Sequence, residues 1–170
     1  MNQRAVKCAF EIMFIMSKFT IKTANADAEA VIEEFLDALE AMSIERFINI
    51  WHENGVHIMP YVPEGFHTRL EGKEAIRHQY DTLLSKCKSL RIPDRVFHFT
   101  NDPNRVWVEF RGEIQVKATG KSYNNTYVGL FTLRDGRIIE YKAYCNPLSF
   151  LNVFGGPDAL CKKLAKSPKK

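Results

Sequence analysis

Residues 105–117 decide the fold class, because they read RVWVEFRGEIQVK and alternate apolar with polar side chains. Alternation with a period of two is typical of a β-strand that buries one face. Three further stretches of the same kind cover 89–100, 122–133 and 137–146. Turn residues separate the four stretches, at 101–104, 119–120 and 135–136. Because short turns join antiparallel neighbours, the second half of the chain predicts an antiparallel sheet.

The first half of the chain has a helical period instead. Apolar residues recur at spacings of three and four over residues 26–41, and Asp27 is suited to cap the start of an amphipathic helix there. Ser43 predicts a second, short helix that extends to Trp51, and a third helix follows Gly72. Helices segregated from an antiparallel sheet form an α+β domain. We therefore predict three helices packed on one mainly antiparallel sheet.

The segment between the second and third predicted helices combines a strand with a loop. Asn54-Gly55 is a turn signal and predicts a strand over residues 56–59. Residues 60–71 contain two prolines and a glycine and have no periodic pattern, so we expect a loop there. Because loops of this length often carry function, this one is a candidate lid over a ligand.

The composition is that of an ordinary globular protein, with 45% hydrophobic and 26% charged residues in a chain of 170. The net charge of +4 comes from the ends, because residues 23–160 hold 15 Lys or Arg against 19 Asp or Glu. A nucleic-acid partner requires clustered positive charge on a folded face, so none is expected. No run of about 18 uncharged apolar residues is present, so no membrane partner is expected either.

The two ends of the chain differ from the body in composition. We divide the chain into a flexible leader over 1–22, a domain over 23–155 and a basic tail over 156–170. Two other interpretations of residues 1–22 stay open, a signal peptide and a segment upstream of a usual start at Met16. The four cysteines are widely spread and form no C-x-x-C pair, which favours a reducing, cytoplasmic location.

Five short motifs point to a known family. They are Glu71-Gly72-Lys73-Glu74, Val106-Trp107-Val108-Glu109, Tyr123-x-Asn125, Asp135-Gly136-Arg137-Ile138 and Tyr144-Cys145-Asn146-Pro147. With the order of elements over residues 26–155, they resemble the nuclear-transport-factor-two-like superfamily, also called SnoaL-like or ketosteroid-isomerase-like. Within it, the chain is similar to the phenazine-biosynthesis A/B proteins. The resemblance implies a cone-shaped domain, in which a strongly curved sheet wraps around a long N-terminal helix and leaves a pocket.

The resemblance also implies a homodimer that pairs through the outer face of the sheet. Apolar residues alternate along one predicted strand at Val106, Val108 and Phe110, so one face of that strand needs cover. We therefore expect two kinds of partner, a second copy of this chain and a small hydrophobic or carbonyl-bearing molecule.

Two positions depart from the phenazine A/B pattern. Ala143 stands where that family has a glutamate, three residues before its Asn-Pro. The family's histidine, seven residues after the glycine that precedes the third helix, corresponds to Gln79, and His78 lies one position earlier. Because Ala143 cannot donate a proton, the acid of a phenazine-type condensation is missing. We therefore expect no phenazine-forming activity, and expect any activity to depend on His78 with Tyr127 or Tyr141.

Acid–base chemistry in an apolar cone requires a titratable group with a shifted pKa and hydroxyl or amide donors for a developing oxyanion. The candidate catalytic residues are His78, Glu109 and Tyr127. The candidate substrate-binding residues are Trp51, His57, Tyr61, Asn125, Tyr141 and Cys145. His52 and His57 straddle a glycine turn rather than lying four apart on a helix, so no metal site is expected. The sequence contains no glycine-rich phosphate-binding loop, so no cofactor is expected.

Two functional classes remain. The first is a cofactor-independent enzyme that isomerises, cyclises, dehydrates or condenses a carbonyl-bearing small molecule. The second is a non-catalytic module, which binds a hydrophobic ligand in the same pocket or only dimerises. A titratable group that points into the pocket beside a hydroxyl donor would favour catalysis. A pocket that holds only tyrosines, amides and apolar side chains would favour binding.

Overall fold

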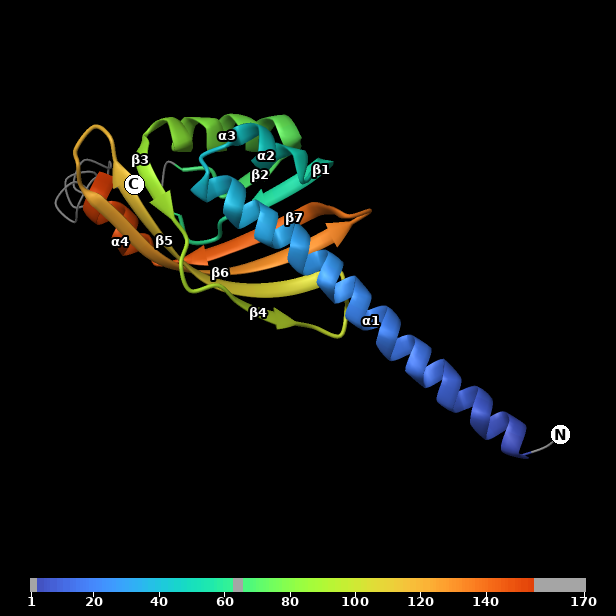
Figure 1. Ribbon diagram of the computed structural model, residues 1–170. Helices are drawn as coiled ribbons and strands as arrows, with labels where there is room; N and C mark the ends of the chain where they lie inside the picture. Colours follow the sequence, from blue (N-terminus) through green and yellow to red (C-terminus); the bar gives the residue numbers. More distant parts are fainter. Residues whose placement is uncertain (1–2, 63–65, 155–170) are drawn as a thin grey trace, which may run out of the picture.

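The computed structural model describes residues 3–62 and 66–154, and these contain four helices and seven strands (Figure 1). The helices are α1 (Gln3–Glu40), α2 (Ile44–Asn49), α3 (Lys73–Ser85) and α4 (Pro147–Phe154). The strands are β1 (Trp51–Ile58), β2 (Arg69–Glu71), β3 (Cys87–Arg91), β4 (Val96–Phe99), β5 (Arg105–Val116), β6 (Ser122–Arg134) and β7 (Arg137–Cys145). The α+β class is confirmed, but the prediction of three helices is wrong, because α4 follows the last strand.

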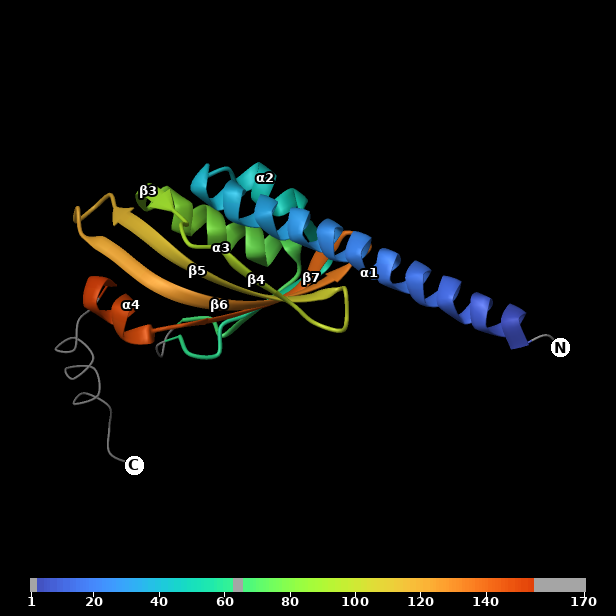
Figure 2. The same cartoon turned by 60° about the horizontal axis from the view of Figure 1, so that its bottom comes forward.

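All seven strands belong to one sheet, in the order β2-β1-β7-β6-β5-β3, and β4 pairs with β5 beside β3. β1 and β7 are parallel, and the other pairs in the described part of the chain are antiparallel. The sheet is strongly curved, and α1, α2 and α3 lie on its inner side (Figure 2). The mainly antiparallel sheet is therefore confirmed. The parallel pair joins strands far apart in the chain, which a pattern of turns does not reveal.

Two details of the first predicted elements are wrong. Trp51 does not extend the second helix but begins β1, where it is fully buried. Its ring packs 6.3 Å from that of Phe35, and this burial outweighs the local helical period. Asn54-Gly55 does not turn the chain but lies inside β1, where the register against β7 shifts.

The predicted strand over 89–100 and the predicted loop over 60–71 are both divided. β3 and β4 are separate strands, because Pro93 between them has no N–H to donate to a ladder and Asp94 adopts a positive φ of 59°. The loop ends in the short strand β2, which pairs with β1.

α1 has two parts with different surroundings. Its C-terminal part crosses the inner face of the sheet and buries Ala28, Ile32, Phe35, Leu36, Ala38 and Leu39. Its N-terminal part extends past the edge of the sheet (Figures 1 and 2) and exposes Met13, Phe14 and Met16 by 62–65%. The predicted helix over 26–41 is thus the end of a longer one, and residues 3–22 of the predicted leader are helical.

The division into leader, domain and tail stays a prediction, and the tail over 156–170 lies outside the described residues. Within the residues that the structure describes, no helix is long and apolar enough to cross a membrane.

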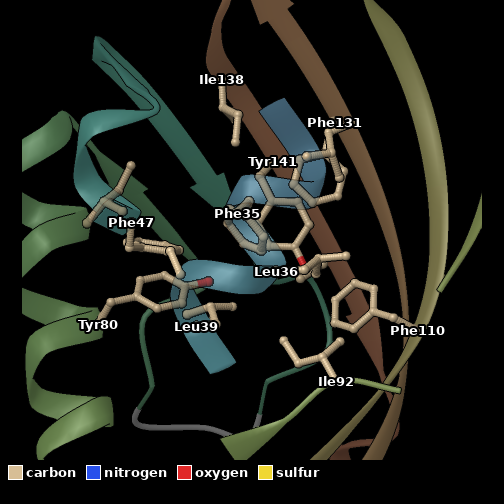
Figure 3. Close-up of a cluster of buried hydrophobic side chains, with 14 of the residues drawn as sticks. Phe35, Leu36, Leu39, Phe47, Tyr80, Ile92, Phe110, Phe131, Ile138 and Tyr141 are labelled. Carbon is tan, nitrogen blue, oxygen red and sulfur yellow. The ribbon is translucent and has the colours of Figure 1, made fainter. Parts of the chain in front are cut away.

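Phe35 of α1 is the centre of the core (Figure 3). Its ring centroid lies 5.0 Å from that of Phe47 in α2, and 5.1 Å from those of Phe131 in β6 and Tyr141 in β7. Tyr80 of α3 lies 6.5 Å from it, in an edge-to-face arrangement. With Trp51 of β1 at 6.3 Å, one ring from each of five elements meets Phe35, which places the helical layer on the sheet.

The residues that predicted an uncovered sheet face point inward instead. Val106, Val108 and Phe110 are buried in the core, so they are not available to a second copy of the chain. The outer side of the same region exposes Val96 by 49% and Val128 by 37%, since both lie opposite Glu109 in the register of the sheet. The homodimer stays a prediction, but Val106, Val108 and Phe110 no longer support it.

Arg95 ties the connection between β3 and β4 to α1. Its guanidinium, with a side chain 17% exposed, lies 2.5–2.7 Å from the carboxylates of Glu33, Asp37 and Glu40. The Glu40 carboxylate also accepts a hydrogen bond from the backbone N–H of Ile92, at 2.6 Å. One cation thus pairs with three acids on the same helix face.

We expect Arg95→Ala to lower the free energy of unfolding by about 2 kcal/mol, because three neighbouring carboxylates lose their shared partly buried cation. Urea unfolding followed by circular dichroism measures this change. Arg46→Ala is the matched control, since Arg46 pairs with Glu34 at 2.7 Å but both side chains are exposed. Its effect should be much smaller, and equal effects of the two variants would contradict the prediction.

Candidate functional site

An apolar cavity of about 180 Å³ lies between α1, α3 and the inner face of the sheet. No described lining residue is an Asp, Glu, Lys or Arg. The polar lining groups are one imidazole, five tyrosine hydroxyls, one amide and one thiol. The lining residues are Phe35, Leu39, His57, Met59, Tyr61, Val62, Gln79, Tyr80, Leu83, Leu90, Ile92, Phe110, Gly112, Ile114, Tyr123, Tyr127, Tyr141, Ala143 and Cys145.

His57, on β1, is the titratable group inside this cavity. Its side chain is buried, and its ring stacks on Tyr141 at 4.9 Å and lies 5.6 Å from the ring of Tyr80. Neither ring nitrogen has a hydrogen-bond partner among the described residues. Burial lowers the pKa of His57 from 6.5 to about 3, so the imidazole is neutral at neutral pH. A buried polar group without a partner is costly, which makes it a marker of function.

The tyrosine hydroxyls around the cavity also stay neutral. Burial raises the pKa of Tyr80, Tyr123, Tyr127 and Tyr141 above the ordinary value of 10. Burial raises the pKa of the Cys145 thiol in the same way. The cavity therefore offers uncharged donors and acceptors and disfavours a charged ligand group that receives no hydrogen bond.

Two glycines make room for the rings on β6 and β7. A Cβ atom on Gly112 would come within 3.0 Å of the Tyr127 ring, and one on Gly129 within 2.7 Å of the Tyr141 ring. The Tyr127 ring also stacks on Phe110 of β5, at a centroid distance of 5.1 Å. Neighbouring strands thus hold both rings flat against the cavity wall.

Asn125, Tyr123 and Tyr127 form a hydrogen-bonded row along one face of β6. The Asn125 amide donates to the Tyr123 hydroxyl at 2.9 Å, and that hydroxyl lies 3.1 Å from the Tyr127 hydroxyl. Asn125 is buried and does not line the cavity, whereas both tyrosines do. The row therefore connects the buried amide of Asn125 to the cavity by hydrogen bonds.

His78 does not lie at the cavity, so its predicted placement is wrong. It is exposed on α3, whereas its neighbours Gln79 and Tyr80 line the cavity. One residue along a helix rotates a side chain by about 100°, which is enough to move it from the inner to the outer side. The inward titratable residue is His57, which the sequence analysis had assigned to substrate binding.

Glu109 lies on the opposite face of the sheet from the cavity, so its predicted placement is also wrong. It is exposed and pairs with His98 of β4 at 2.9 Å. Val108 and Phe110, its neighbours on β5, are buried. Strand alternation correctly separates the two faces but does not say which face the helices cover.

The remaining candidates differ in how they meet the cavity. Trp51 is fully buried in the core and does not line the cavity. Tyr61 lines it but is 60% exposed, so it lies at the mouth. Tyr127, Tyr141 and Cys145 are lining residues. Their roles in binding or catalysis stay predictions.

Tyr80, Gln79 and Tyr123 are site residues that were not predicted from the sequence. Tyr123 could have been found, because it shares the period-two face of Asn125 and Tyr127. Tyr80 shares the apolar face of α3 with Ile76 and Leu84 and resembles an ordinary core residue in sequence. Among the described residues, no three His, Cys, Asp or Glu side chains are grouped closely enough to hold a metal ion.

A second hollow, of about 330 Å³, adjoins the cavity. The two share Met59, Val62, Gln79, Leu83, Ile114 and Tyr123. The second hollow also includes the exposed residues Phe66, His67, Thr82 and Lys86, so it reaches the surface of the domain. The cavity therefore has an adjoining outer space in which a substituent of a ligand could lie.

The family model for the SnoaL-like domain matches residues 32–141, which span the C-terminal part of α1 and most of the sheet. The chain belongs to the SnoaL-like family. This family assignment fits the curved sheet and the cavity beneath α1, and it confirms the resemblance that the motifs indicated.

Two relatives extend the match. The uncharacterised protein YesE of Bacillus subtilis is 33% identical over 128 residues, covering 74% of this SnoaL-like chain and 85% of the relative. An uncharacterised PhzA/B-like protein of Pseudomonas aeruginosa is 31% identical over 136 residues, covering 80% and 96%.

Two solved structures have the same fold. A Bacillus subtilis protein provisionally described as an isomerase superposes with a TM-score of 0.74 and 30% identity, covering 78% of this chain and 96% of that one. A phenazine biosynthesis-related protein from Pseudomonas aeruginosa superposes with a TM-score of 0.70 at 18% identity, covering 81% and 91%. The second likeness establishes the fold alone.

The neutral burial of His57 predicts a specific acid sensitivity. Because its pKa of about 3 in the folded state lies below its ordinary value of 6.5, the unfolded chain binds a proton there that the native chain does not. Stability due to this site is therefore lost as the pH falls from about 6.5 toward 3. Between about pH 7 and pH 4.5 the loss should be roughly 2–3 kcal/mol.

His57→Phe should remove this loss, because phenylalanine keeps the stack on Tyr141 and does not titrate. We expect the variant to be at least as stable as wild type at neutral pH and to lose less stability in acid. Urea unfolding over the same pH range measures both quantities, with His78→Gln as the exposed-histidine control. Parallel pH profiles for wild type and His57→Phe would overturn the prediction.

Proposed function

We propose that this protein is a cofactor-independent enzyme of the isomerase or cyclase kind, acting on a small carbonyl-bearing molecule, with His57 as its acid–base group. The observation that carries the proposal is the imidazole of His57, which lies unpartnered among the described residues beside tyrosine hydroxyls in an apolar cavity. This is the arrangement that distinguishes catalysis from simple binding, since binding of an apolar ligand needs no such group.

The chemistry would begin with a proton transfer. Neutral His57 takes a proton from a carbon next to the substrate carbonyl, so a C–H bond breaks, an N–H bond forms, and the electron pair moves to the carbonyl oxygen. Imidazolium is unfavourable in this cavity by itself, as the lowered pKa of His57 indicates. The enolate forms together with it and supplies the opposite charge, which offsets the cost of burying the cation.

The second step would use the enolate. Return of the proton to a different carbon completes an isomerisation. In a ring closure, the enolate carbon instead attacks a second carbonyl of the same molecule, and the alkoxide that forms there takes the proton back from His57. A tyrosine hydroxyl that donates to the enolate oxygen lowers the barrier to both steps. The raised pKa values of Tyr80, Tyr127 and Tyr141 keep these hydroxyls protonated and able to donate.

The size and charge of the cavity restrict the substrate. A dry protein cavity of roughly 150 Å³ holds benzene, so about 180 Å³ suits a molecule with one ring. A neutral substrate is favoured, because no charged side chain among the described residues lines the cavity. A longer substituent would extend into the outer hollow.

Membership of the SnoaL-like family supports the proposal, and so does the isomerase description of the structure that is 30% identical. The alternative is a non-catalytic module that holds a hydrophobic ligand. The apolar lining favours it, as does the absence of a carboxylate among the described lining residues. The two functions differ in whether a bound ketone exchanges its protons.

Deuterium exchange tests the proposal without a known substrate. We expect wild type to catalyse exchange of the acidic C–H protons of one or more one-ring ketones or enones in heavy water, followed by nuclear magnetic resonance. His57→Gln should slow this exchange by about 10²- to 10⁴-fold, because the proton acceptor is lost. His78→Gln, the matched change at an exposed histidine, should stay within about twofold of wild type.

Binding without exchange would favour the alternative module. Equal exchange by wild type and His57→Gln would exclude His57 as the acid–base group. Slowing by His78→Gln alone would restore the role that the sequence analysis had assigned to His78.

Ala143 generates a separate prediction about phenazine-type condensation. It lines the cavity and pairs with Gly129 across β6 and β7, so a longer side chain there would point toward the ligand. We expect wild type not to turn over an aminocyclohexenone efficiently, and Ala143→Glu to gain activity, because a buried carboxyl with a raised pKa can protonate the departing oxygen.

Ala143→Gln is the matched control, since it has the same size but cannot donate an acidic proton. Chromatography of the products measures the rates. Efficient condensation by wild type would contradict the prediction, and so would equal gains in the glutamate and glutamine variants.

A further inference from the structure

Hydrogen bonds to the backbone determine which way the Asn125 amide points. Its Oδ1 atom accepts from the backbone N–H groups of Thr126 at 3.0 Å and Asn146 at 3.2 Å. Its Nδ2 atom donates to the backbone oxygen of Asn146 at 2.9 Å and to the Tyr123 hydroxyl at 2.9 Å. A reversed amide would place its NH₂ group against two N–H donors, so only this orientation satisfies the surroundings.

This orientation gives the row of hydroxyls a direction. An amide N–H can only donate, so it occupies an acceptor position on the Tyr123 oxygen. The Tyr127 oxygen lies 3.1 Å from that of Tyr123, and either hydroxyl of this pair is able to donate. Donation from the amide polarises the Tyr123 O–H, which favours the direction from Tyr123 to Tyr127. In this direction the Tyr127 oxygen accepts, and its own proton is available to a third group. Among the described residues, the Tyr127 hydroxyl has no other hydrogen-bond partner.

We infer that Asn125 is a positioning residue, which directs the Tyr123–Tyr127 pair so that the Tyr127 hydroxyl donates a hydrogen bond to an anionic or enolic oxygen of the ligand. The position of Tyr127 supports this, since it lines the cavity while its ring is held between Phe110 and Gly112. Each donor in the row is polarised by the one before it, which strengthens the last bond.

The ligand group that Tyr127 would hold is an enolate or phenolate oxygen. A neutral hydroxyl at the end of a donor row binds an enolate or phenolate oxygen more tightly than a neutral one, because the bond is charge-assisted. In this respect the inference rests on the proposed function, in which an enolate forms in the cavity. It adds which tyrosine holds the oxygen, and it assigns a task to a buried amide that touches no ligand.

The residue that precedes α4 fixes the orientation of the Asn125 amide. Asn146, whose backbone holds the Asn125 amide on both sides, also accepts a hydrogen bond from the backbone N–H of Leu148 through its own Oδ1 atom, at 3.0 Å. The side chain that directs the hydroxyls is thus anchored on the turn that begins a helix. The orientation of Asn125 therefore does not depend on the ligand.

The test uses 4-nitrophenol, whose anion and neutral form absorb at different wavelengths, so the ionisation of the bound probe is read directly. Nitrobenzene, which lacks the hydroxyl, reports whether the cavity is intact. We expect wild type to bind 4-nitrophenolate. Tyr127→Phe should weaken that binding by about 10- to 100-fold with little change for nitrobenzene, because one charge-assisted hydrogen bond is lost.

Tyr123→Phe and Asn125→Leu test the direction of the row. Both should weaken nitrophenolate binding by about three- to tenfold and shift the ionisation of the bound probe toward the neutral form. If instead Tyr127 donates to Tyr123, Tyr123→Phe would free the Tyr127 proton and tighten binding. Tighter binding by Tyr123→Phe would therefore overturn the inference, even if Asn125→Leu fails to fold.

Tyr141→Phe separates this inference from the proposed function. We expect it to affect nitrophenolate less than Tyr127→Phe does. A larger effect of Tyr141→Phe, or no binding of nitrophenolate by wild type, would overturn the role of Tyr127. Proton exchange that still depends on His57 would then leave the proposed function standing. If instead nitrophenolate binds as expected but no exchange depends on His57, the role of Tyr127 stands and the proposed function is overturned.

Discussion

The burial of one ring, Phe35, is the constraint on which the rest of the structure depends. A curved sheet has an inner face that must be covered, and α1 covers it with a single apolar stripe. Phe35 lies where rings from α2, α3, β1, β6 and β7 converge, so each of those elements is positioned relative to it (Figure 3). The cavity begins beside this cluster, and Phe35, Tyr80 and Tyr141 line it.

The core and the candidate site therefore share residues, and their requirements conflict. Core packing favours apolar groups at the position of His57, which stacks on Tyr141 and has no hydrogen-bond partner among the described residues. The protein nevertheless keeps an imidazole there, at a cost in stability that a phenyl ring would avoid. By contrast, Asn125 is equally buried but every polar atom of its amide is bonded. One buried polar group is fully satisfied and the other is left open toward the cavity.

The sequence predicted the fold better than the site, for a physical reason. Periods of two and of about 3.6 tell which side chains share a face, so β5, β6 and β7 and the helical layer were found. They do not tell which face is covered, and for this reason Glu109 was placed inside although it pairs with His98 outside. The prediction for His78 was wrong by one residue, because the next two residues of α3, Gln79 and Tyr80, line the cavity. The parallel pairing of β1 with β7, which brings His57 beside Tyr141, has no local signal at all.

An uncharged lining limits the chemistry that such a cavity can support. Within it, a charge is most readily created together with its opposite, because a hydrogen bond alone offsets only part of the cost of burying a lone ion. A proton that moves from substrate carbon to His57 satisfies this condition, since the imidazolium and the enolate arise in one step and disappear in the next. A reaction that begins with an anionic substrate or expels a charged product would not. The proposed reactions, isomerisation and ring closure, keep every atom and the net charge inside the cavity throughout, and this is why a neutral histidine surrounded by neutral hydroxyls is suited to them.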